Sequence, residues 1–332
     1  YFNTKLYTGN GGTQSITGVG FQPDFNWTKS RTTTQSHVLT DAVRGVTKTL
    51  FTNATQAEAT LSGITAFGTD GYTLGASDLW SENSASFASW NWLANGAGSA
   101  NTDGSISSTV SANTTSGFSI VSYTGNGGST PKTVGHGLGV APKMIIIKPR
   151  NLTYDWMTYN ENVGATKGMC LNTTQAPFTS SNFNDTAPTT SVFSVKNNAT
   201  NETNGTYIAY CFAEKQGYSK FGSYTGNGSA SSGTFIYTGF KPAFVMIKRT
   251  DTTGSWEMFD AKREGFNPQV HGLYANLSNA EDNTDDLLDL LSNGFKLYHD
   301  GGGLNASGGN YIYMAFAEAP LVGTNNVPCT AR

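Results

Sequence analysis

A short string of residues occurs three times in this chain and constrains its fold more than any other feature. Tyr-Thr-Gly-Asn-Gly stands at residues 7–11, 123–127 and 224–228. Self-similarity at a long spacing indicates a chain built from repeated structural units. Because so short a string could also be a recurring turn, agreement further along each copy is needed to establish a repeat.

That agreement is present in all three copies. A segment that ends in lysine follows the string each time, at 21–29, 140–148 and 240–248. An apolar segment closes each copy, at 87–93, 207–213 and 311–317. We therefore interpret the chain as three copies of one unit and call them the first, second and third repeats.

The segments between the turns favour β-strands. Residues 311–316 are rich in strand-forming side chains, and 144–148 and 244–248 are short apolar runs typical of strands inside a sandwich. The Asn-Gly and Asp-Gly steps supply the positive φ angles that tight hairpins need. A single helix is predicted, at 280–291. The sequence thus predicts an all-β fold of three tandem antiparallel β-sandwiches of about 100 residues each.

The repeats set the expected domain boundaries. We place the first sandwich at 1–98, the second at 106–217, the third at 218–318 and a C-terminal arm at 319–332. Small polar residues at 94–105 predict a linker. A segment at 106–112 opens the second repeat, and we expect the first repeat to lack that opening strand. We also expect the three sandwiches to lie in line, with the second and third docked closely because almost no linker separates them.

Composition excludes several classes of protein. Charged residues make up 13% of the chain, about half of the usual ~25%. Hydroxyl and amide side chains must therefore provide most of the polar surface that is exposed to solvent. That balance is typical of secreted and virion-surface β-proteins. The net charge of −3 and the absence of a basic run disfavour a nucleic-acid partner. No apolar window is long enough to predict a membrane span.

The three cysteines do not have the spacing of a disulfide framework or a zinc site. They are Cys170, Cys211 and Cys329. Cys170 and Cys211 share a repeat and could bridge, but nothing in the sequence fixes their separation. We therefore favour free thiols.

The three repeats resemble a known domain over nearly the whole chain, most clearly in the second repeat. Residues 117–128 read GFSIVSYTGNGG and 134–144 read VGHGLGVAPKM, which together resemble a repeat domain of marine tailed-phage virion proteins. The segment YIYMAFAEAPLV at 311–322 is similar to the end of the same repeats. The resemblance implies a jelly-roll, concanavalin A-like sandwich of the laminin-G type, as in tail-fibre and adhesin proteins. It brings no catalytic residues.

Trp80 is the candidate carbohydrate-binding residue. It has no evident counterpart in the other repeats and lies in a polar loop at 77–85. An exposed ring there would stack on a sugar or pack on a neighbouring subunit. The remaining tryptophans align with apolar or aromatic residues of the other repeats, which indicates core positions.

Two Asp/Arg pairs are the next candidates. Asp41 and Arg44 match Asp260 and Arg263, whereas the second repeat has no arginine at 160–164. We interpret both pairs as exposed ion pairs that fix a turn, with a contribution to stability of about 0–1 kcal/mol. Glycosidase chemistry would need two carboxylates facing one cleft, and this pattern does not supply them.

An acidic run in the third repeat gives the candidate metal ligands. Asp282, Asp285 and Asp286 lie within it, and calcium prefers several oxygen ligands. The calcium-loop order of aspartates is absent, so a solvated acidic surface is the favoured interpretation. Calcium is thus the alternative, and no other cofactor is expected.

The expected function is structural. We expect a non-enzymatic protein of a phage-like virion or an extracellular fibre that assembles into a symmetric oligomer or filament. The alternative is a carbohydrate-binding adhesin that recognises host surface glycans, and a polysaccharide-degrading tail spike ranks last. In the C-terminal arm, Leu321, Val322 and Val327 are apolar, which predicts that the arm lies on a neighbouring subunit.

Overall fold

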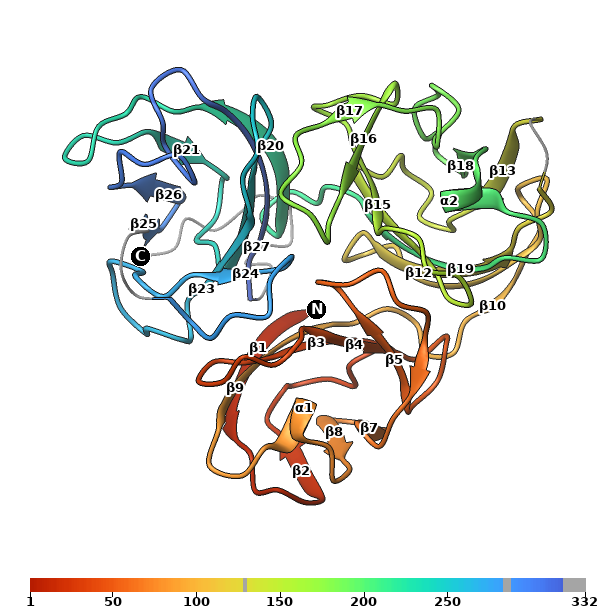
Figure 1. Cartoon of the computed structure of the whole chain (residues 1–332), viewed down its shortest axis with the longest axis horizontal. Coiled ribbons are helices and arrows are strands. Elements are labelled where there is room, and N and C mark those ends of the chain that lie inside the picture. Colours follow the sequence, from red (N-terminus) through yellow and green to blue (C-terminus); the bar gives the residue numbers. More distant parts are fainter. Residues whose placement is uncertain (128–129, 283–287, 319–332) are drawn as a thin grey trace.

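The structure is a computed structural model that describes residues 1–127, 130–282 and 288–318. Three consecutive stretches of chain each form a large antiparallel sheet with a smaller antiparallel sheet. The all-β prediction is therefore confirmed. Figure 1 shows the three stretches as three lobes around a common centre.

The first lobe is built from the first repeat. Its large sheet has the order β1-β9-β3-β4-β5-β6 and its small sheet the order β2-β8-β7. The elements are β1 (Phe2–Thr8), β2 (Gln14–Thr17), β3 (Phe25–Ser30), β4 (Val38–Asp41), β5 (Lys48–Phe51), β6 (Ala59–Thr60), β7 (Ile64–Gly68), β8 (Gly71–Leu74), α1 (Asp78–Ser81) and β9 (Ser86–Trp92).

The second lobe has the largest sheet, in the order β10-β11-β12-β19-β14-β15-β16-β17, together with the pair β13-β18. The elements are β10 (Ser99–Asn101), β11 (Ser108–Asn113), β12 (Phe118–Thr124), β13 (Lys132–Gly135), β14 (Met144–Pro149), β15 (Met157–Asn160), β16 (Lys167–Cys170), β17 (Phe178–Thr179), β18 (Val192–Val195), α2 (Asn198–Asn201) and β19 (Thr206–Phe212).

The third lobe has the order β20-β27-β22-β23-β24 in its large sheet and β21-β26-β25 in its small one. The elements are β20 (Ser219–Thr225), β21 (Phe235–Tyr237), β22 (Phe244–Arg249), β23 (Trp256–Asp260), β24 (Leu273–Tyr274), β25 (Leu288–Leu291), β26 (Gly294–Leu297) and β27 (Asn310–Phe316).

The central strands of the large sheets are buried on both faces. Every residue of β3 and of β14 is buried. Strand β14 is a continuous apolar run at 144–147, as expected of a strand buried on both faces, whereas β3 alternates aromatic residues with Asn26 and Thr28, which hydrogen-bond to each other. One face of each large sheet covers its own small sheet. The other face packs against the neighbouring repeats, and a single apolar cluster joins residues of all three.

Three aromatic residues meet at the centre of this cluster. They occupy equivalent positions in the closing strands of the three repeats: Trp92 pairs with Phe25, Phe212 with Met144 and Phe316 with Phe244. Their ring centroids are 5.5–6.4 Å apart in all three pairings. The three repeats therefore surround a pseudo-threefold axis, and the expectation that they lie in line is wrong.

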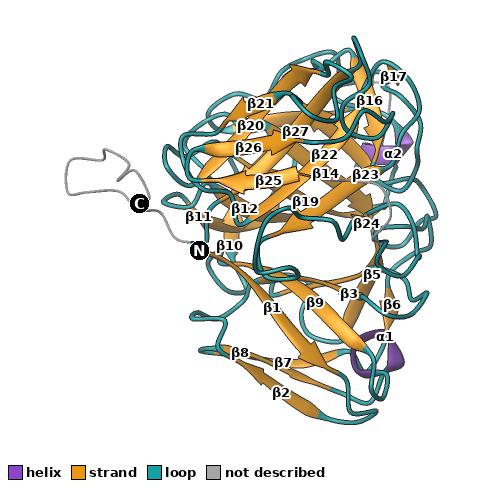
Figure 2. Ribbon diagram, turned by 90° about the vertical axis from the view of Figure 1, so that its left-hand side faces the viewer, coloured by secondary structure: helices purple, strands orange, loops and turns teal. Residues whose placement is uncertain are grey.

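The connections between repeats lie at one end of this axis. The residue after each closing strand donates its amide to the carbonyl of the residue that precedes the neighbouring strand β1, β12 or β20. The three pairs are Leu93 with Tyr1, Ala213 with Gly117 and Ala317 with Tyr218. Figure 2 shows the N-terminus at this end and helices α1 and α2 at the other.

One expectation about segments needs correction. Residues 99–101 of the expected linker form β10, which pairs with β11 and extends the second sheet. Among the described residues, the first and third repeats have β1 and β20 at the edge of their large sheets, and the second repeat alone has further strands, β10 and β11, beyond β12.

The predicted helix at 280–291 is also wrong where the structure describes it. Leu288–Leu291 forms β25, in which Leu288 and Leu290 point inward and Asp289 and Leu291 are partly exposed. That alternation has a period of two, and a two-residue turn at 292–293 connects β25 to β26, with Leu291 paired to Gly294. The leucines at 287, 288, 290 and 291 are compatible with a helical period of 3.6 as well as with a strand period of two, because the run is so short.

Candidate functional site

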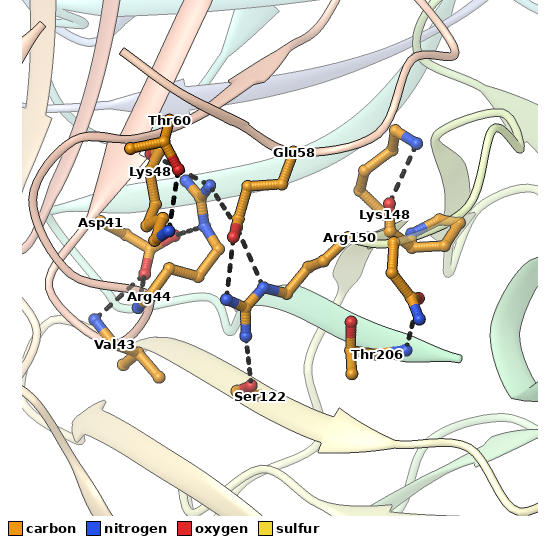
Figure 3. A network of polar contacts seen from close by, with 12 residues as sticks. Asp41, Val43, Arg44, Lys48, Glu58, Thr60, Ser122, Lys148, Arg150 and Thr206 are labelled. Carbon is orange, nitrogen blue, oxygen red and sulfur yellow. Dashed lines mark hydrogen bonds and ion pairs between the residues drawn. The ribbon is translucent and has the colours of Figure 1, made fainter. Parts of the chain in front are cut away.

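The Asp/Arg pair of the first repeat is part of a chain of charges that crosses to the second repeat (Figure 3). Asp41 accepts from the backbone amides of Val43 and Arg44, and also pairs with the Arg44 side chain. Arg44 pairs with Glu58 at 3.1 Å, and Glu58 pairs with Arg150 of the second repeat at 3.0 Å. We call this the first charged seam.

A second charged seam repeats the arrangement between the third and first repeats. Asp260 pairs with Arg263 at 2.6 Å, Arg263 with Glu281 at 2.7 Å, and Glu281 with Arg31 of the first repeat at 2.8 Å. The backbone joins in as well, since the amide of Glu281 donates to the carbonyl of Arg31.

Each seam also receives a hydrogen bond from an aromatic side chain of the adjoining repeat. The hydroxyl of Tyr210 donates to Asp41 over 2.7 Å, and the indole of Trp90 donates to Asp260 over 3.0 Å. Tyr210 and Trp90 occupy equivalent positions in β19 and β9. The aspartates therefore link repeats in addition to fixing turns.

The prediction that these pairs are exposed is wrong. The side chains of Asp41 and Arg44 are fully buried, and those of Asp260 and Arg263 are nearly so. Burial alone would raise the pKa of Glu58, but the hydrogen bond from Arg150 and the charge of Arg44 lower it overall. A general acid needs a raised pKa, so the environment of Glu58 opposes that role.

The seam between the second and third repeats has uncharged residues at all the corresponding places. Asn160 replaces the aspartate, Val163 the first arginine, Pro177 the glutamate and Thr250 the second arginine. The concerted change leaves no half of a charged pair behind, which matters because a buried charge without its partner is costly.

Two contacts are kept where the charges are lost. The indole of Trp256 donates to the carbonyl of Cys170 over 3.0 Å, as that of Trp156 donates to the carbonyl of Phe51 over 2.8 Å. The ammonium group of Lys248 donates to the carbonyl of Thr174, as that of Lys148 donates to the carbonyl of Thr55.

The three lysines at the ends of the central strands are buried. Lys29, Lys148 and Lys248 are 0% exposed and donate to backbone carbonyls. Burial lowers the pKa of each to about 8. Lys148 and Lys248 thus contribute a hydrogen bond between repeats, whereas the carbonyls that accept from Lys29 belong to its own repeat.

Trp80 is not an exposed loop residue, which corrects its expected role. It lies in α1, is 0% exposed and packs in the core of the first sandwich. A Cβ atom added at Gly63 would lie 2.5 Å from its ring, so that glycine makes room for it. A ring in this position cannot stack on a sugar.

Trp80 also has counterparts that sequence comparison missed. Its carbonyl accepts from the hydroxyl of Tyr7, just as those of Thr200 and Leu304 accept from Tyr123 and Tyr224. The donors are the tyrosines of the repeated string, but their partners lie 73, 77 and 80 residues further along the chain, so no constant spacing in the sequence marks the equivalence.

The other predicted site residues lie mostly outside the described part. Asp285 and Asp286 fall in the gap at 283–287, and Leu321, Val322 and Val327 lie beyond residue 318. Asp282 is described, and its amide pairs with the carbonyl of Gly272. Within the described residues, no three His, Cys, Asp or Glu side chains gather as metal ligands.

Cys170 and Cys211 are buried free thiols, as favoured from the sequence. Burial raises the pKa of Cys170 to about 12. Neither has the low pKa that a reactive thiolate needs. Cys329 lies beyond residue 318.

The small sheet of the third repeat exposes two aromatic side chains on its outer face. Phe235 is 45% exposed and Tyr237 is 65% exposed, while Ile236 between them is buried. Directly paired residues of an antiparallel sheet point to the same side. The outer face therefore has two cross-strand rows, Phe235–Lys296–Asp289 and Tyr237–Gly294–Leu291, and we call it the β21 face.

Gly294 gives this face its shape. A Cβ atom added there would lie 3.1 Å from Cε2 of Phe235, so the phenyl ring leans over the glycine. Lys296 extends its ammonium group over the ring of Tyr298, 4.9 Å from the centroid. The result is an aromatic strip with charged groups beside it.

A protein-family model described as a domain of unknown function (DUF7483) matches residues 1–320 of the chain. The chain belongs to this DUF7483 family. The searches of curated proteins and of solved structures gave no match.

The match shows that a DUF7483 domain covers all three sheet pairs, so the family unit is the whole ring rather than one repeat. In the part of this DUF7483 chain that the structure describes, no helix is long and apolar enough to cross a membrane.

The aromatic strip is specific to the third repeat of this DUF7483 chain. Strand β2 has Ser15 and Thr17 at the two outward positions, on either side of the buried Ile16. Strand β13 has Thr133 and Gly135 there, around the buried Val134. The sequence signal for this site lies in the alignment of the three strands, because only that alignment sets Phe235 and Tyr237 against the small residues of β2 and β13.

Proposed function

We propose that this DUF7483 chain is a non-enzymatic structural protein of a virion surface or an extracellular fibre, and that it assembles with copies of itself into a symmetric oligomer or filament. The observation that carries the proposal is the shared core. One apolar cluster unites the three repeats, and buried contacts cross every seam, so the chain forms a single block rather than hinged domains.

A block of this kind suits a load-bearing role. Any repeat that moved away from the other two would have to break at least one charged seam and the central ring contacts. Relative motion between domains is expected unless a large apolar interface joins them, and here one apolar cluster is shared by all three repeats. The resemblance to phage virion repeats agrees with a structural role.

The distribution of polar groups supports the absence of catalysis. The seam carboxylates are held by arginines, and the environment of Glu58 lowers its pKa. A pocket of about 290 Å³ between the first and third repeats is lined by six residues, among them Lys5 and Lys262 and no carboxylate. A lysine-lined pocket of this kind does not offer the two carboxylates of a glycosidase.

The test is to image the native assembly and to assay the purified chain in parallel. Electron micrographs and light scattering should show ordered multimers, and incubation with host polysaccharide should release no reducing ends. A chain that stays monomeric at all concentrations, or that degrades polysaccharide, would overturn the proposal.

A second candidate function is a carbohydrate-binding adhesin. The exposed aromatic strip of the β21 face favours it, because a soluble protein gains nothing for its own stability from large exposed rings. The rings replace small residues, serine, threonine and glycine, found at the same positions in the other repeats. Binding of the full chain to immobilised glycans would test this candidate.

A further inference from the structure

We propose that the β21 face is a saccharide-binding site, in which Phe235 and Tyr237 stack on consecutive sugar rings and Lys296 and Asp289 hydrogen-bond to sugar hydroxyls. The inference rests on the adhesin candidate and assigns its site. It does not depend on the proposed self-assembly.

The position of the two rings is the first argument. They are two residues apart on one side of a strand, which separates their Cα atoms by roughly 7 Å. Two stacking platforms at that separation, aligned along β21, suit an extended chain of pyranose rings. The C–H face of a pyranose is apolar and packs on an aromatic face, while its hydroxyl groups point outward.

The neighbouring charges are the second argument. Lys296 lies directly opposite Phe235, and Asp289 lies directly opposite Lys296 on the far strand. A donor and an acceptor therefore flank the strip on the same face. Sugar hydroxyls both donate and accept, so this pairing of an apolar strip with both kinds of charge fits a neutral saccharide better than an anion or an acyl chain.

The size of the strip argues against a second copy of the chain as its occupant. A buried aromatic side chain covers roughly 150–250 Å², so the exposed parts of Phe235 and Tyr237 amount to roughly 200 Å². A stable protein interface needs about 800 Å² from each partner. A short oligosaccharide requires much less.

The chain offers its own design for the test. The double variant Phe235→Ser, Tyr237→Thr gives β21 the outward residues of β2, which folds with Ser15 and Thr17 at these positions. The matched control is Phe266→Ser. Phe266 is 69% exposed in the same repeat but belongs to the loop beside β25, at the opposite edge of the small sheet.

The experiment measures binding of the full chain to cellulose-, chitin- and mannan-derived oligosaccharides and to bacterial surface polysaccharides. At least one probe should bind the original chain, and the double variant should lose about tenfold or more in affinity. F266S should bind as the original does. Thermal melting of both variants should be unchanged, since the replaced side chains point outward.

The possible failures are distinguishable. Binding that persists in the double variant would overturn this site while leaving the adhesin function intact. An equal loss in F266S would show nonspecific adhesion to any exposed ring and overturn the site as well. No binding to any probe would overturn both, and if the double variant then lost self-association, the face would be an interface between copies.

Discussion

The indole of Trp90 in the first repeat donates a hydrogen bond to the buried carboxylate of Asp260 in the third, over 3.0 Å. No peptide connection joins these two repeats directly, since the second lies between them in the chain. Tyr210 makes the equivalent contact to Asp41. A tryptophan in one repeat and a tyrosine in another therefore connect neighbouring repeats from the same strand position.

Removing the hydroxyl of Tyr210 should weaken the seam between the first and second repeats. Tyr210→Phe takes one donor from the buried Asp41, and we expect a loss of about 1–2 kcal/mol in the free energy of unfolding. Tyr218→Phe is the matched control, because the hydroxyl of Tyr218 is buried with no hydrogen-bond partner among the described residues. Urea denaturation should show the control as neutral or slightly stabilised.

The first charged seam should tolerate a concerted change better than a single one. Arg44→Val leaves Asp41 buried without its main partner, and we expect a loss of about 3–5 kcal/mol. Adding Asp41→Asn reproduces the residues Asn160 and Val163 of the uncharged seam and should recover part of that loss. A double variant less stable than R44V would contradict the pairing, and chemical denaturation of all three chains decides between the outcomes.

Acid should destabilise the chain through His37. Burial, with the charges of Lys29 and Arg263, lowers its pKa well below 6.5. Below about pH 6.5 the unfolded chain therefore binds a proton that the folded chain does not, and the free energy of unfolding falls as the pH falls. His37→Gln should flatten this slope in pH-dependent melting.

His136 has a lowered pKa for the same main reason, burial, so H37Q should remove part of the slope and the double variant with His136→Gln more. An unchanged slope in both would show that these histidines are not the groups responsible.

As the pH rises into the alkaline range, the three buried lysines should increase the free energy of unfolding. Their folded pKa is about 8, below the unfolded value of roughly 10.4. Between these values the unfolded chain holds protons that the folded chain has released, so the free energy of unfolding rises with pH. Burial raises the pKa of Tyr72 and Tyr210, which reverses the trend above about pH 10.

The measurement is urea unfolding at a series of pH values across this window. Lys148→Met should remove about a third of the rise, because one of three equivalent groups no longer titrates. Flat stability between neutral pH and the onset of tyrosine ionisation would contradict the lysine assignment.

Trp80 should matter for folding and not for binding. Trp80→Ala leaves a cavity in the core of the first sandwich, and we expect a loss of about 3–5 kcal/mol. Any glycan affinity of the fraction that remains folded should equal that of the original chain. A loss of affinity without a loss of stability would restore Trp80 as a ligand residue.

The strands could be predicted from the sequence because turns and apolar runs are local features. The arrangement around an axis could not, because the partners of Asp41 and Asp260 come from other repeats and leave no local pattern. Trp80 was misjudged since polar neighbours in its loop concealed a buried side chain. Phe235 and Tyr237 alternate with Ile236 as any half-buried strand would, and only comparison with Ser15 and Thr17 marks them as unusual.

The equivalent connections at one end of the axis make the starting point of the chain in the ring nearly arbitrary, while the charged seams fix which repeats are neighbours. Tyr1 stacks edge-on against Tyr218 at 5.9 Å, and the amide of Ala317 donates to the carbonyl of that same Tyr218. Tyr218 thus contacts both Tyr1, through its ring, and the residue that follows β27, through its carbonyl. A circular permutant that opens the chain between repeats and joins these ends would trace the same ring in a different order, because non-covalent contacts already close it where the backbone does not.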